Sequence, residues 1–207
     1  MNWITKFIKP KIASLFKKKT AESEQVLWTT CECKNLIYKE DLQKNLNCCP
    51  KCGAHHKLTC VERFEIFFDN KEFSSISTPL PKDDPINFID KKKYTDRLKL
   101  ARKITKQDDA VAISTGKVND IEVTVGAQDF RFIGGSFGAA SGEAFIHGIQ
   151  HAIDNKNPFI FFSCSGGQRM MESAIALMQM SRTVLAVNEL KKNNLPYIVV
   201  LTNPTTG

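Results

Sequence analysis

The sequence predicts an α/β protein that contains a parallel strand–helix–strand crossover and is preceded by a small cysteine-rich domain. Two observations predict this class. From about residue 61, short apolar runs typical of buried strands alternate with segments of helical periodicity. Six of the seven cysteines lie within residues 28–60. We therefore divide the chain into a tail and linker (residues 1–27), a cysteine-rich domain (28–60) and an α/β domain (61–207).

The composition indicates a soluble protein with an uneven distribution of charge. Of the 207 residues, 42% are hydrophobic and 25% are charged, and no apolar run approaches the ~18 residues that span a bilayer. The formal net charge is +7, but residues 1–19 hold six lysines and no acidic residue, which leaves the remaining chain near +1. The basic balance therefore describes the tail and gives no support for a nucleic-acid surface on the body of the protein.

The tail itself is expected to form a short amphipathic helix. Its apolar side chains recur at roughly helical spacing, which favours docking on the protein itself or on a partner, with adsorption to a membrane surface as the alternative. It lacks the uninterrupted apolar centre of a signal peptide. We therefore expect a cytoplasmic protein. In that reducing compartment, the clustered cysteines indicate metal binding rather than disulfides. The apolar positions of the tail are Trp3, Ile4, Phe7, Ile8, Ile12, Leu15 and Phe16.

The cysteine-rich domain has the pattern of a zinc ribbon. The segment C49-P-K-C52-G has the form of a zinc knuckle, in which a tight turn points two thiolates at one ion. Fifteen residues separate Cys49 from Cys33, and residues 35–46 among them suit a short hairpin. The predicted ligands are Cys31, Cys33, Cys49 and Cys52. Four protein ligands would leave no open position, so the zinc would be structural.

The first cysteine pair departs from the knuckle pattern. C31-E-C33 has one intervening residue where a knuckle has two, so its turn needs a different geometry. Two alternatives therefore remain open: another ligand substitutes, or the ribbon folds without metal. The candidate substitutes are Cys48, His55 and His56. Cys60 and Cys164 fall outside the pattern and are expected to be buried thiols.

The first half of the α/β domain is predicted from periodicity and turn residues. Residues 61–69 are expected to be helical, and 77–85 form a proline-punctuated loop. Residues 90–107 have the pattern of a charged amphipathic helix. Val- and Ile-rich segments at 110–115 and 122–128 predict a β-hairpin. In the charged helix, the side chains expected on one face are Tyr94, Leu98, Ala101 and Ile104.

The second half of the domain carries the predicted crossover. A glycine-rich loop (130–142) precedes a helix that ends near residue 154. A buried strand at 159–164, a helix from about 168 to 193 and a second buried strand at 197–202 then predict a parallel βαβ unit. The helix before the first strand should bury Ala144, Phe145, Gly148, Ile149 and Ala152.

The turn Ser165-Gly166-Gly167 joins that strand to the next helix and is our candidate catalytic feature. The first N–H groups of a helix have no internal partner, and the helix dipole adds partial positive charge there. We predict that the main-chain amides of Gly166, Gly167 and Gln168 form an oxyanion hole, which requires them to be free of internal acceptors. Such a site needs no nucleophilic side chain. The alternative is a glycine turn that exists only for packing.

Another glycine turn, G134-G-S-F-G138, lies upstream and again precedes a helix. In chain order it is the first glycine turn, and Ser165-Gly166-Gly167 is the second. It matches the G-x-S-x-G nucleophile elbow, but the last histidine, His151, lies in the next helix, so a triad in the required order is excluded. We interpret the turn as a second backbone-lined wall of a substrate pocket, built by Gly134, Gly135, Ser136 and Gly138. The alternative is a loop that only packs against its neighbour.

Several motifs together resemble a known family. W28-T-T-C, C49-P-K-C52, "KKYTDRLKLA", "FIGGSFGAASGEAF", "SCSGGQRMMESAIALMQM" and "LPYIVVLTNPTTG" occur in the order found in β subunits of bacterial acetyl-coenzyme A carboxylase carboxyltransferase. The resemblance runs from about residue 26 to the last residue. It implies a zinc ribbon followed by a crotonase-like α/β fold, a spiral of ββα units, of which residues 61–207 would be the N-terminal, incomplete part.

The resemblance also implies a reaction and partners. Members of the family transfer the carboxyl group from carboxybiotin on the biotin carboxyl carrier protein to acetyl-coenzyme A, which gives malonyl-coenzyme A for fatty acid synthesis. Their active site lies at an interface with an α subunit in an α2β2 assembly, and the resemblance places the second oxyanion hole, for the biotin ureido oxygen, on that subunit. Arg169 joins the predicted substrate-binding residues, since an arginine suggests the coenzyme A phosphates, although we interpret it as a structural anchor.

Three departures from the family pattern bear on these expectations. The C-x-C spacing replaces C-x2-C at the metal site; Gln168 stands where alanine is usual, which leaves the backbone donor intact; and the sequence stops at Gly207, where family members continue. Two other functions remain as alternatives: a nucleic-acid-binding zinc ribbon, whose affinity would fall steeply with salt, and another crotonase-type acyl-coenzyme A carboxyltransferase or decarboxylase subunit.

Overall fold

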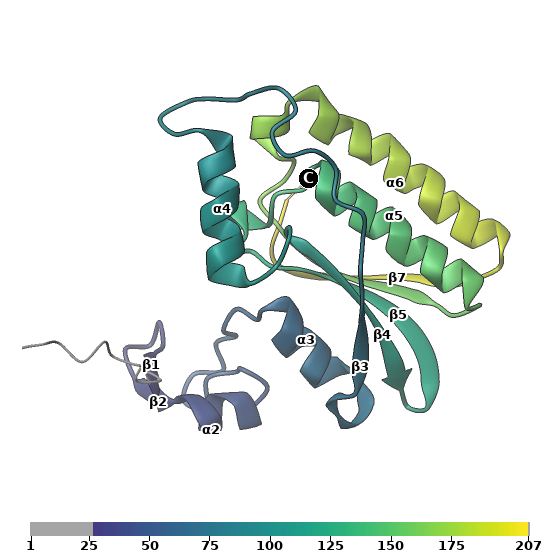
Figure 1. The fold of residues 1–207 in the computed structure, drawn as a ribbon. Helices are drawn as coiled ribbons and strands as arrows, with labels where there is room; N and C mark the ends of the chain where they lie inside the picture. Colours follow the sequence, from purple (N-terminus) through teal and green to yellow (C-terminus); the bar gives the residue numbers. More distant parts are fainter. Residues whose placement is uncertain (1–26, 207) are drawn as a thin grey trace, which may run out of the picture. The chain divides into compact units, whose positions relative to one another are not determined.

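The computed structural model describes residues 27–206, which form parts of two compact units that divide between His56 and Lys57 (Figure 1). The predicted amphipathic tail lies outside the described residues. None of the helices within residues 27–206 is long and apolar enough to cross a membrane.

The first unit is a small ribbon. Strands β1 (Trp28–Thr30) and β2 (Leu36–Tyr38) pair antiparallel, and helix α2 (Lys39–Lys44) follows directly. The predicted hairpin at 35–46 is therefore wrong, because the hairpin turn lies upstream, where the Cys31 amide donates to the Asn35 carbonyl. The buried side chains of the unit include Cys31, Ile37, Leu42 and Cys49.

The second unit is built on a five-stranded sheet in the order β3-β4-β5-β6-β7. Strand β4 pairs antiparallel with both β3 and β5, whereas β5, β6 and β7 are parallel, so the predicted hairpin and the predicted parallel crossover are both confirmed. The β4–β5 turn consists of Asn119 and Asp120, both with positive φ, which suits a two-residue hairpin loop. The strand bounds are β3 Phe73–Ile76, β4 Val111–Val118, β5 Ile121–Gln128, β6 Phe159–Ser165 and β7 Tyr197–Thr205.

Helices cover both faces of the sheet (Figure 1). Helices α5 (Ala139–Asp154) and α6 (Ala174–Lys192) lie side by side on one face, and α3 (Cys60–Phe67) packs on the other. The alternation of side chains along β6 supplies both cores: Phe159 and Phe161 pack toward α5, whereas Ile160 and Phe162 pack toward α3. The inward positions predicted for α5 are all buried.

Helix α4 (Tyr94–Thr105) is shorter than the predicted 90–107 segment. Tyr94, Leu98 and Ala101 are buried as expected, but Ile104 is 56% exposed and Thr105 is buried in its place. The prediction for Ile104 is therefore wrong, because the buried stripe shifts by one residue at the last turn.

Two further predictions in the crossover differ from the described structure. Helix α6 begins at Ala174 rather than near 168, since residue 168 bridges to Phe137 and a short 3₁₀ turn (Met170–Glu172) follows. Within residues 27–206, strand β7 is the last strand of the sheet and Leu201 is 71% exposed, so the predicted burial of β7 is not seen in the described part of the chain.

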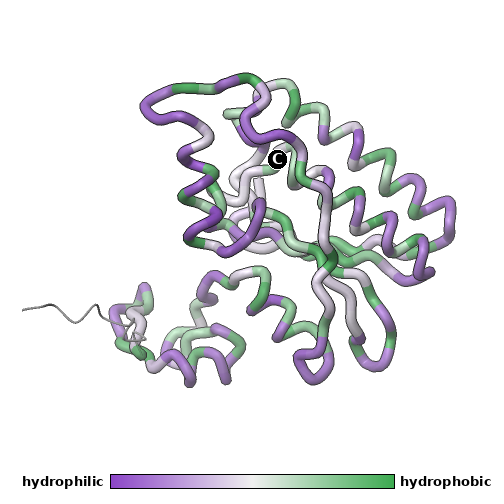
Figure 2. The backbone as a smooth tube through the Cα atoms, in the orientation of Figure 1, coloured by the Kyte–Doolittle hydropathy of each residue, from purple (hydrophilic) through white to green (hydrophobic). Residues whose placement is uncertain are grey.

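Helix α6 also exposes apolar side chains, and Figure 2 shows hydrophobic and hydrophilic residues interspersed along it. The exposed large apolar side chains of α6 are Leu177, Met178, Met180, Val184 and Leu185.

Candidate functional site

The two glycine turns predicted from the sequence lie against each other beyond the carboxyl ends of β5 and β6. The Gly166 amide donates to the Gly134 carbonyl at 2.9 Å. Two more main-chain hydrogen bonds of 2.9 Å, from Phe137 to the Gly167 carbonyl and from Arg169 to the Phe137 carbonyl, continue the contact. Main-chain hydrogen bonds therefore join the two turns directly, so they do not form two separate walls of a pocket.

Only part of the predicted oxyanion hole is available in this structure. The Gly166 amide is engaged with Gly134, and the Gly167 amide donates to the Ser165 hydroxyl oxygen at 2.9 Å. The Gln168 amide has no acceptor among residues 27–206. Because α6 begins six residues later, its dipole does not act at Gln168 as the sequence predicted. The donors left are the Gln168 amide and the Gly167 amide, whose present acceptor is a rotatable hydroxyl.

A cavity of about 350 Å³ lies beside this pair of donors. Gly167 and Gln168 line it together with Ser165, and the remaining lining is largely apolar. Aromatic and aliphatic walls around a few polar groups are typical of ligand sites. The apolar lining comes from Phe137, Phe145, Phe161, Met180, Val184, Tyr197, Val199 and Leu201.

Of the predicted substrate-binding turn, Phe137 lines this cavity, but the four residues predicted to form its wall do not. Gly134, Gly135, Ser136 and Gly138 are absent from its walls. A Cβ built at Gly135 would lie 2.1 Å from the Cys164 carbonyl oxygen, and one at Gly138 would lie 2.7 Å from the Glu172 carboxylate. The structure thus favours the alternative interpretation, a loop whose glycines permit close packing against the second turn.

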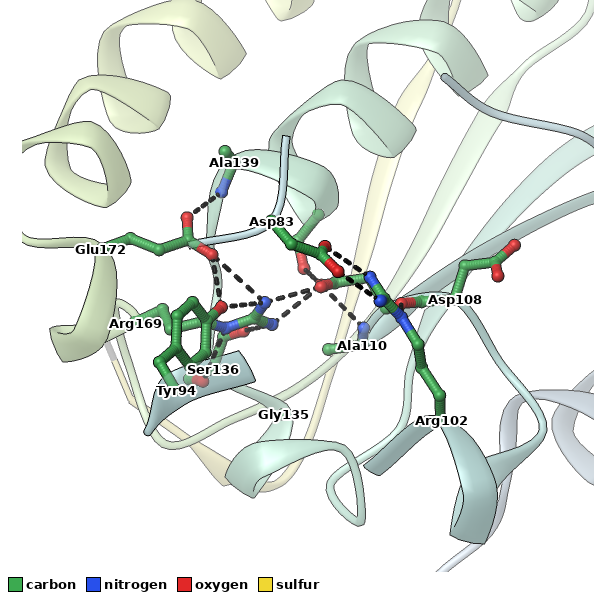
Figure 3. Close-up of polar contacts among 12 residues, drawn as sticks. Asp83, Tyr94, Arg102, Asp108, Ala110, Gly135, Ser136, Ala139, Arg169 and Glu172 are labelled. Carbon is green, nitrogen blue, oxygen red and sulfur yellow. Dashed lines mark hydrogen bonds and ion pairs between the residues drawn. The ribbon is translucent and has the colours of Figure 1, made fainter. Parts of the chain in front are cut away.

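Arg169 is a structural anchor rather than a ligand for coenzyme A phosphates. Its residue is only 1% exposed, and its guanidinium pairs with both oxygens of Asp109 at 2.6 and 2.8 Å (Figure 3). It also donates to the Ser136 carbonyl and hydroxyl oxygens. Burial acts to lower the pKa of Arg169, but the Asp109 carboxylate outweighs it and the pKa is raised. The prediction that Arg169 contacts substrate is corrected on these grounds, and the anchor interpretation is supported.

Glu172 and Tyr94 complete this buried network and were missed by the sequence analysis. The Tyr94 hydroxyl donates to the Glu172 carboxylate at 2.6 Å, and the Ala139 amide donates to the other Glu172 oxygen at 2.6 Å (Figure 3). Glu172 therefore caps the N-terminus of α5 with a carboxylate, as the helix dipole favours. The partners are 33 and 78 residues apart in sequence, so no local pattern signals them.

Gln128 is a third missed residue, and it joins the first glycine turn to β6. At the end of β5, its side-chain nitrogen donates to the Gly135 carbonyl at 3.1 Å. Its side-chain oxygen accepts from the Cys164 amide at 3.1 Å and from the Ser163 hydroxyl at 3.2 Å. Gln128 is 6% exposed and lines the cavity, so it joins the first glycine turn to β6 from within the site.

The four predicted metal ligands meet in the ribbon. The Sγ atoms of Cys31, Cys33, Cys49 and Cys52 all lie within 4.8 Å of one another. The Cys31–Cys52 and Cys33–Cys49 pairs are separated by 3.6 and 3.9 Å. A zinc ion bound at ~2.3 Å by four thiolates in a tetrahedron requires S···S distances of ~3.8 Å. The donor set therefore fits zinc despite the C-x-C spacing.

A local hydrogen bond favours the thiolate form of one predicted ligand, Cys33. The Asn35 side-chain amide donates to Cys33 Sγ at 3.2 Å and lowers the pKa of that thiol to about 6. The alternative ligands do not join the cluster, and Cys48 Sγ instead donates to the Leu46 carbonyl at 3.8 Å. Of the two remaining thiols, Cys60 is fully buried as predicted, whereas Cys164 is only half-buried.

Solved structures share the fold of much of this chain. A transcarboxylase 12S structure matches 70% of this chain and 26% of its own, with a TM-score of 0.53 and 23% identity. A Pseudomonas malonate decarboxylase hetero-dimer matches 72% of this chain and 54% of its own, with a TM-score of 0.52 and 18% identity. These matches, with the carboxyl transferase domain reported next, confirm the predicted crotonase-like α/β class.

Family and sequence matches cover the whole described chain. Residues 54–207 match the carboxyl transferase domain, and residues 28–52 match the acetyl-CoA carboxylase zinc finger domain. The chain is 50% identical to the acetyl-coenzyme A carboxylase carboxyl transferase subunit beta of Pelagibacter ubique, over all of this chain and 68% of that protein. It is 45% identical to the protein of the same name from Jannaschia sp., over 65% of its length, so it spans about two thirds of such relatives. The chain belongs to the family of acetyl-coenzyme A carboxylase carboxyl transferase β subunits.

Proposed function

We propose that this protein is the β subunit of a carboxyltransferase that moves the carboxyl group from N1-carboxybiotin to acetyl-coenzyme A and forms malonyl-coenzyme A. The observation that carries the proposal is the apolar cavity lined by Gly167 and Gln168, in a chain 50% identical to a subunit named for this reaction. The matches give no comparable support to a nucleic-acid-binding ribbon.

Forming an enolate from the thioester requires hydrogen-bond donors from the protein and does not require a nucleophilic side chain. When a proton leaves the methyl carbon of the thioester, negative charge develops on the thioester oxygen, and in this proposal the Gln168 amide holds that charge. Two observations support this role: Gln168 lines the cavity, and its amide has no acceptor among residues 27–206. The Gly167 amide becomes a second donor once the Ser165 hydroxyl turns away. The enolate carbon forms a bond to the carboxyl carbon, and the electron pair of the broken C–N bond stays on the biotin ureido group. The ureido nitrogen takes up the proton released from the methyl carbon, which regenerates biotin.

The proposal includes partners. The biotin is carried by a biotin carboxyl carrier protein, and the second oxyanion hole, for the ureido oxygen, is supplied by a carboxyltransferase α subunit in an α2β2 assembly. Zinc held by the four clustered cysteines stabilises the ribbon and takes no part in the reaction, since four thiolates leave no open coordination position.

The test is carboxybiotin-dependent malonyl-coenzyme A formation by the chain mixed with its α-type partner. Gln168→Pro removes the amide hydrogen and should lower kcat by about 10²–10³, the typical loss of one oxyanion donor. Gln168→Ala keeps that hydrogen and should retain activity. Both variants must still form the complex, as measured by size-exclusion chromatography.

Two outcomes would count against the proposal. Equal activity of the proline and alanine variants would remove Gln168 from the oxyanion hole. Consumption of malonyl-coenzyme A without any transfer to or from biotin would identify a decarboxylase instead.

A further inference from the structure

A buried network of charged and polar groups lies beneath the two glycine turns, away from the cavity walls (Figure 3). Its members are Tyr94 from α4, Asp109 from the segment before β4, and Arg169 and Glu172 from the segment between the second turn and α6. All four residues are at most 5% exposed. Such networks are costly to bury unless every member is satisfied, so their geometry is strongly determined.

Two members of the network, Arg169 and Glu172, form hydrogen bonds with main-chain groups of the first turn and the start of α5. Arg169 donates to the Ser136 carbonyl in the first turn. Glu172 accepts from the Ala139 amide, where the first turn enters α5. In the second turn, the Arg169 amide is bound to the Phe137 carbonyl, one residue after the Gln168 amide. The position of the Gln168 amide thus depends on where the Arg169 side chain is held.

Tyr94 contacts Arg169 and one of the two carboxylates that pair with it. Its hydroxyl donates to the Glu172 oxygen Oε1 at 2.6 Å and accepts from Arg169 Nη1 at 3.3 Å. The same Glu172 oxygen lies 3.5 Å from Arg169 Nη1, a longer contact than the 2.6 Å pair with Asp109. Without the hydroxyl, Glu172 Oε1 loses its short donor and moves toward Arg169, which draws the guanidinium away from Asp109 and Ser136.

We propose that Tyr94 is a positioning residue for the reaction: through Glu172 and Arg169, its hydroxyl sets the place of the Gln168 amide at the cavity. This inference rests on the proposed function and extends it to α4, an element that does not line the cavity. The hydroxyl touches no substrate; it acts through the two side chains that fix the turns.

The test compares Tyr94→Phe with Thr105→Val. Both substitutions delete one buried hydroxyl from α4. The Thr105 hydroxyl donates to the Ala101 carbonyl at 2.8 Å and accepts from the Gln107 amide at 3.3 Å, and neither partner belongs to the network. In the complex with the partner subunit, Tyr94→Phe should lower kcat about 10–100-fold with KM for acetyl-coenzyme A changed less than about threefold, because a misplaced donor acts on the transition state. The Thr105→Val variant should lose about as much thermal stability as Tyr94→Phe, but its kcat should equal that of the wild type.

A second readout does not require turnover. Hydrogen exchange of the 207-residue chain, measured by mass spectrometry, should be faster in Tyr94→Phe than in Thr105→Val for peptides spanning 134–139 and 166–172. If the wild-type complex makes no malonyl-coenzyme A, the proposed function fails, while the exchange comparison still decides whether Tyr94 holds the turns.

Three results would overturn the inference. One is a kcat of Tyr94→Phe within twofold of that of Thr105→Val. Another is unchanged exchange in both turn peptides. If Tyr94→Phe does not fold, Glu172→Gln replaces it with the same expected loss of kcat; failure of both variants to fold beside a folded Thr105→Val would make the network a folding element only.

Discussion

At the scale of single residues, the cost of burying charge explains why Arg169 has so many partners. An ionised group removed from water costs several kcal/mol unless hydrogen bonds replace its hydration. Asp109 meets the guanidinium with both oxygens and also accepts from the Ser141 hydroxyl. The pairing therefore makes Arg169 a structural anchor between the two turns and leaves its charge unavailable to a ligand.

Removing the Arg169 guanidinium should lower the free energy of unfolding far more than breaking an ion pair at the surface. Arg169→Met leaves Asp109 buried without its cation, and we expect a loss of about 3–5 kcal/mol in the free energy of unfolding. Arg102→Met breaks a similar two-oxygen pair with Asp83, but those side chains are 29% and 44% exposed, and the expected loss is below about 1 kcal/mol. Urea denaturation of both variants measures the difference, and comparable losses would contradict the buried-anchor role.

The adjacent glycines of the first turn offer a matched test of close packing. Gly134 and Gly135 have nearly equal φ values, +65° and +63°, so alanine carries a similar backbone strain at either position, about 1–2 kcal/mol. A Cβ at Gly134 meets nothing within 4 Å, whereas one at Gly135 collides with the Cys164 carbonyl. Gly135→Ala should therefore lower the melting temperature clearly more than Gly134→Ala. Equal shifts would show that the turns are not held in contact.

At the scale of elements, the ribbon turn shows how a shortened spacing still makes a metal site. The β1–β2 turn closes with the Lys34 amide donating to the Cys31 carbonyl, and Lys34 has a positive φ of 64°. This tight turn brings Cys33 back toward the knuckle although one residue fewer separates it from Cys31. The ligand set is consequently fixed by the turn and does not require Cys48.

Zinc content should distinguish the ligands from their neighbour. Cys33→Ser removes one of four clustered thiols, and we expect bound zinc to fall well below one equivalent per chain because metal affinity depends on the complete thiolate set. Cys48→Ser should keep about one equivalent, since that thiol lies outside the cluster. Metal analysis of the purified proteins checks both, and a loss of zinc from the Cys48 variant alone would reassign the site.

At the scale of the whole molecule, the two units differ in how they are stabilised. The second unit has aromatic and aliphatic cores on both faces of a five-stranded sheet. The described part of the first unit buries only a few side chains, two of which are cysteines of the metal cluster. Domains of that size seldom fold without a metal or a disulfide.

Chelation should therefore unfold one unit and spare the other. On addition of a strong zinc chelator, or on acidification that protonates the ligating thiols, amides of residues 28–52 should lose protection from hydrogen exchange. The amides of β4, β5 and β6 should keep their protection, because their cores contain no metal ligand. Loss of protection in both units at the same chelator concentration would contradict independent stabilisation.

The sequence by itself determined the features that depend on local periodicity and residue type. Helix α5, with its inward residues, follows from apolar positions spaced along one face. The β4–β5 hairpin follows from β-branched runs around a polar turn, and the knuckle follows from C-P-K-C-G. Each of these signals lies within about twenty residues, where backbone preference and side-chain spacing suffice to specify the structure.

The tertiary structure alone decided which groups of the site are free and which are engaged. The Gly166 amide is occupied by a carbonyl 32 residues upstream, and Arg169 is paired with an aspartate 60 residues away. The exposure of β7 likewise depends on what lies beside a sheet edge, and not on its apolar composition. Hydrogen-bond partners and burial arise from packing between distant segments, so no local pattern in the sequence specifies them.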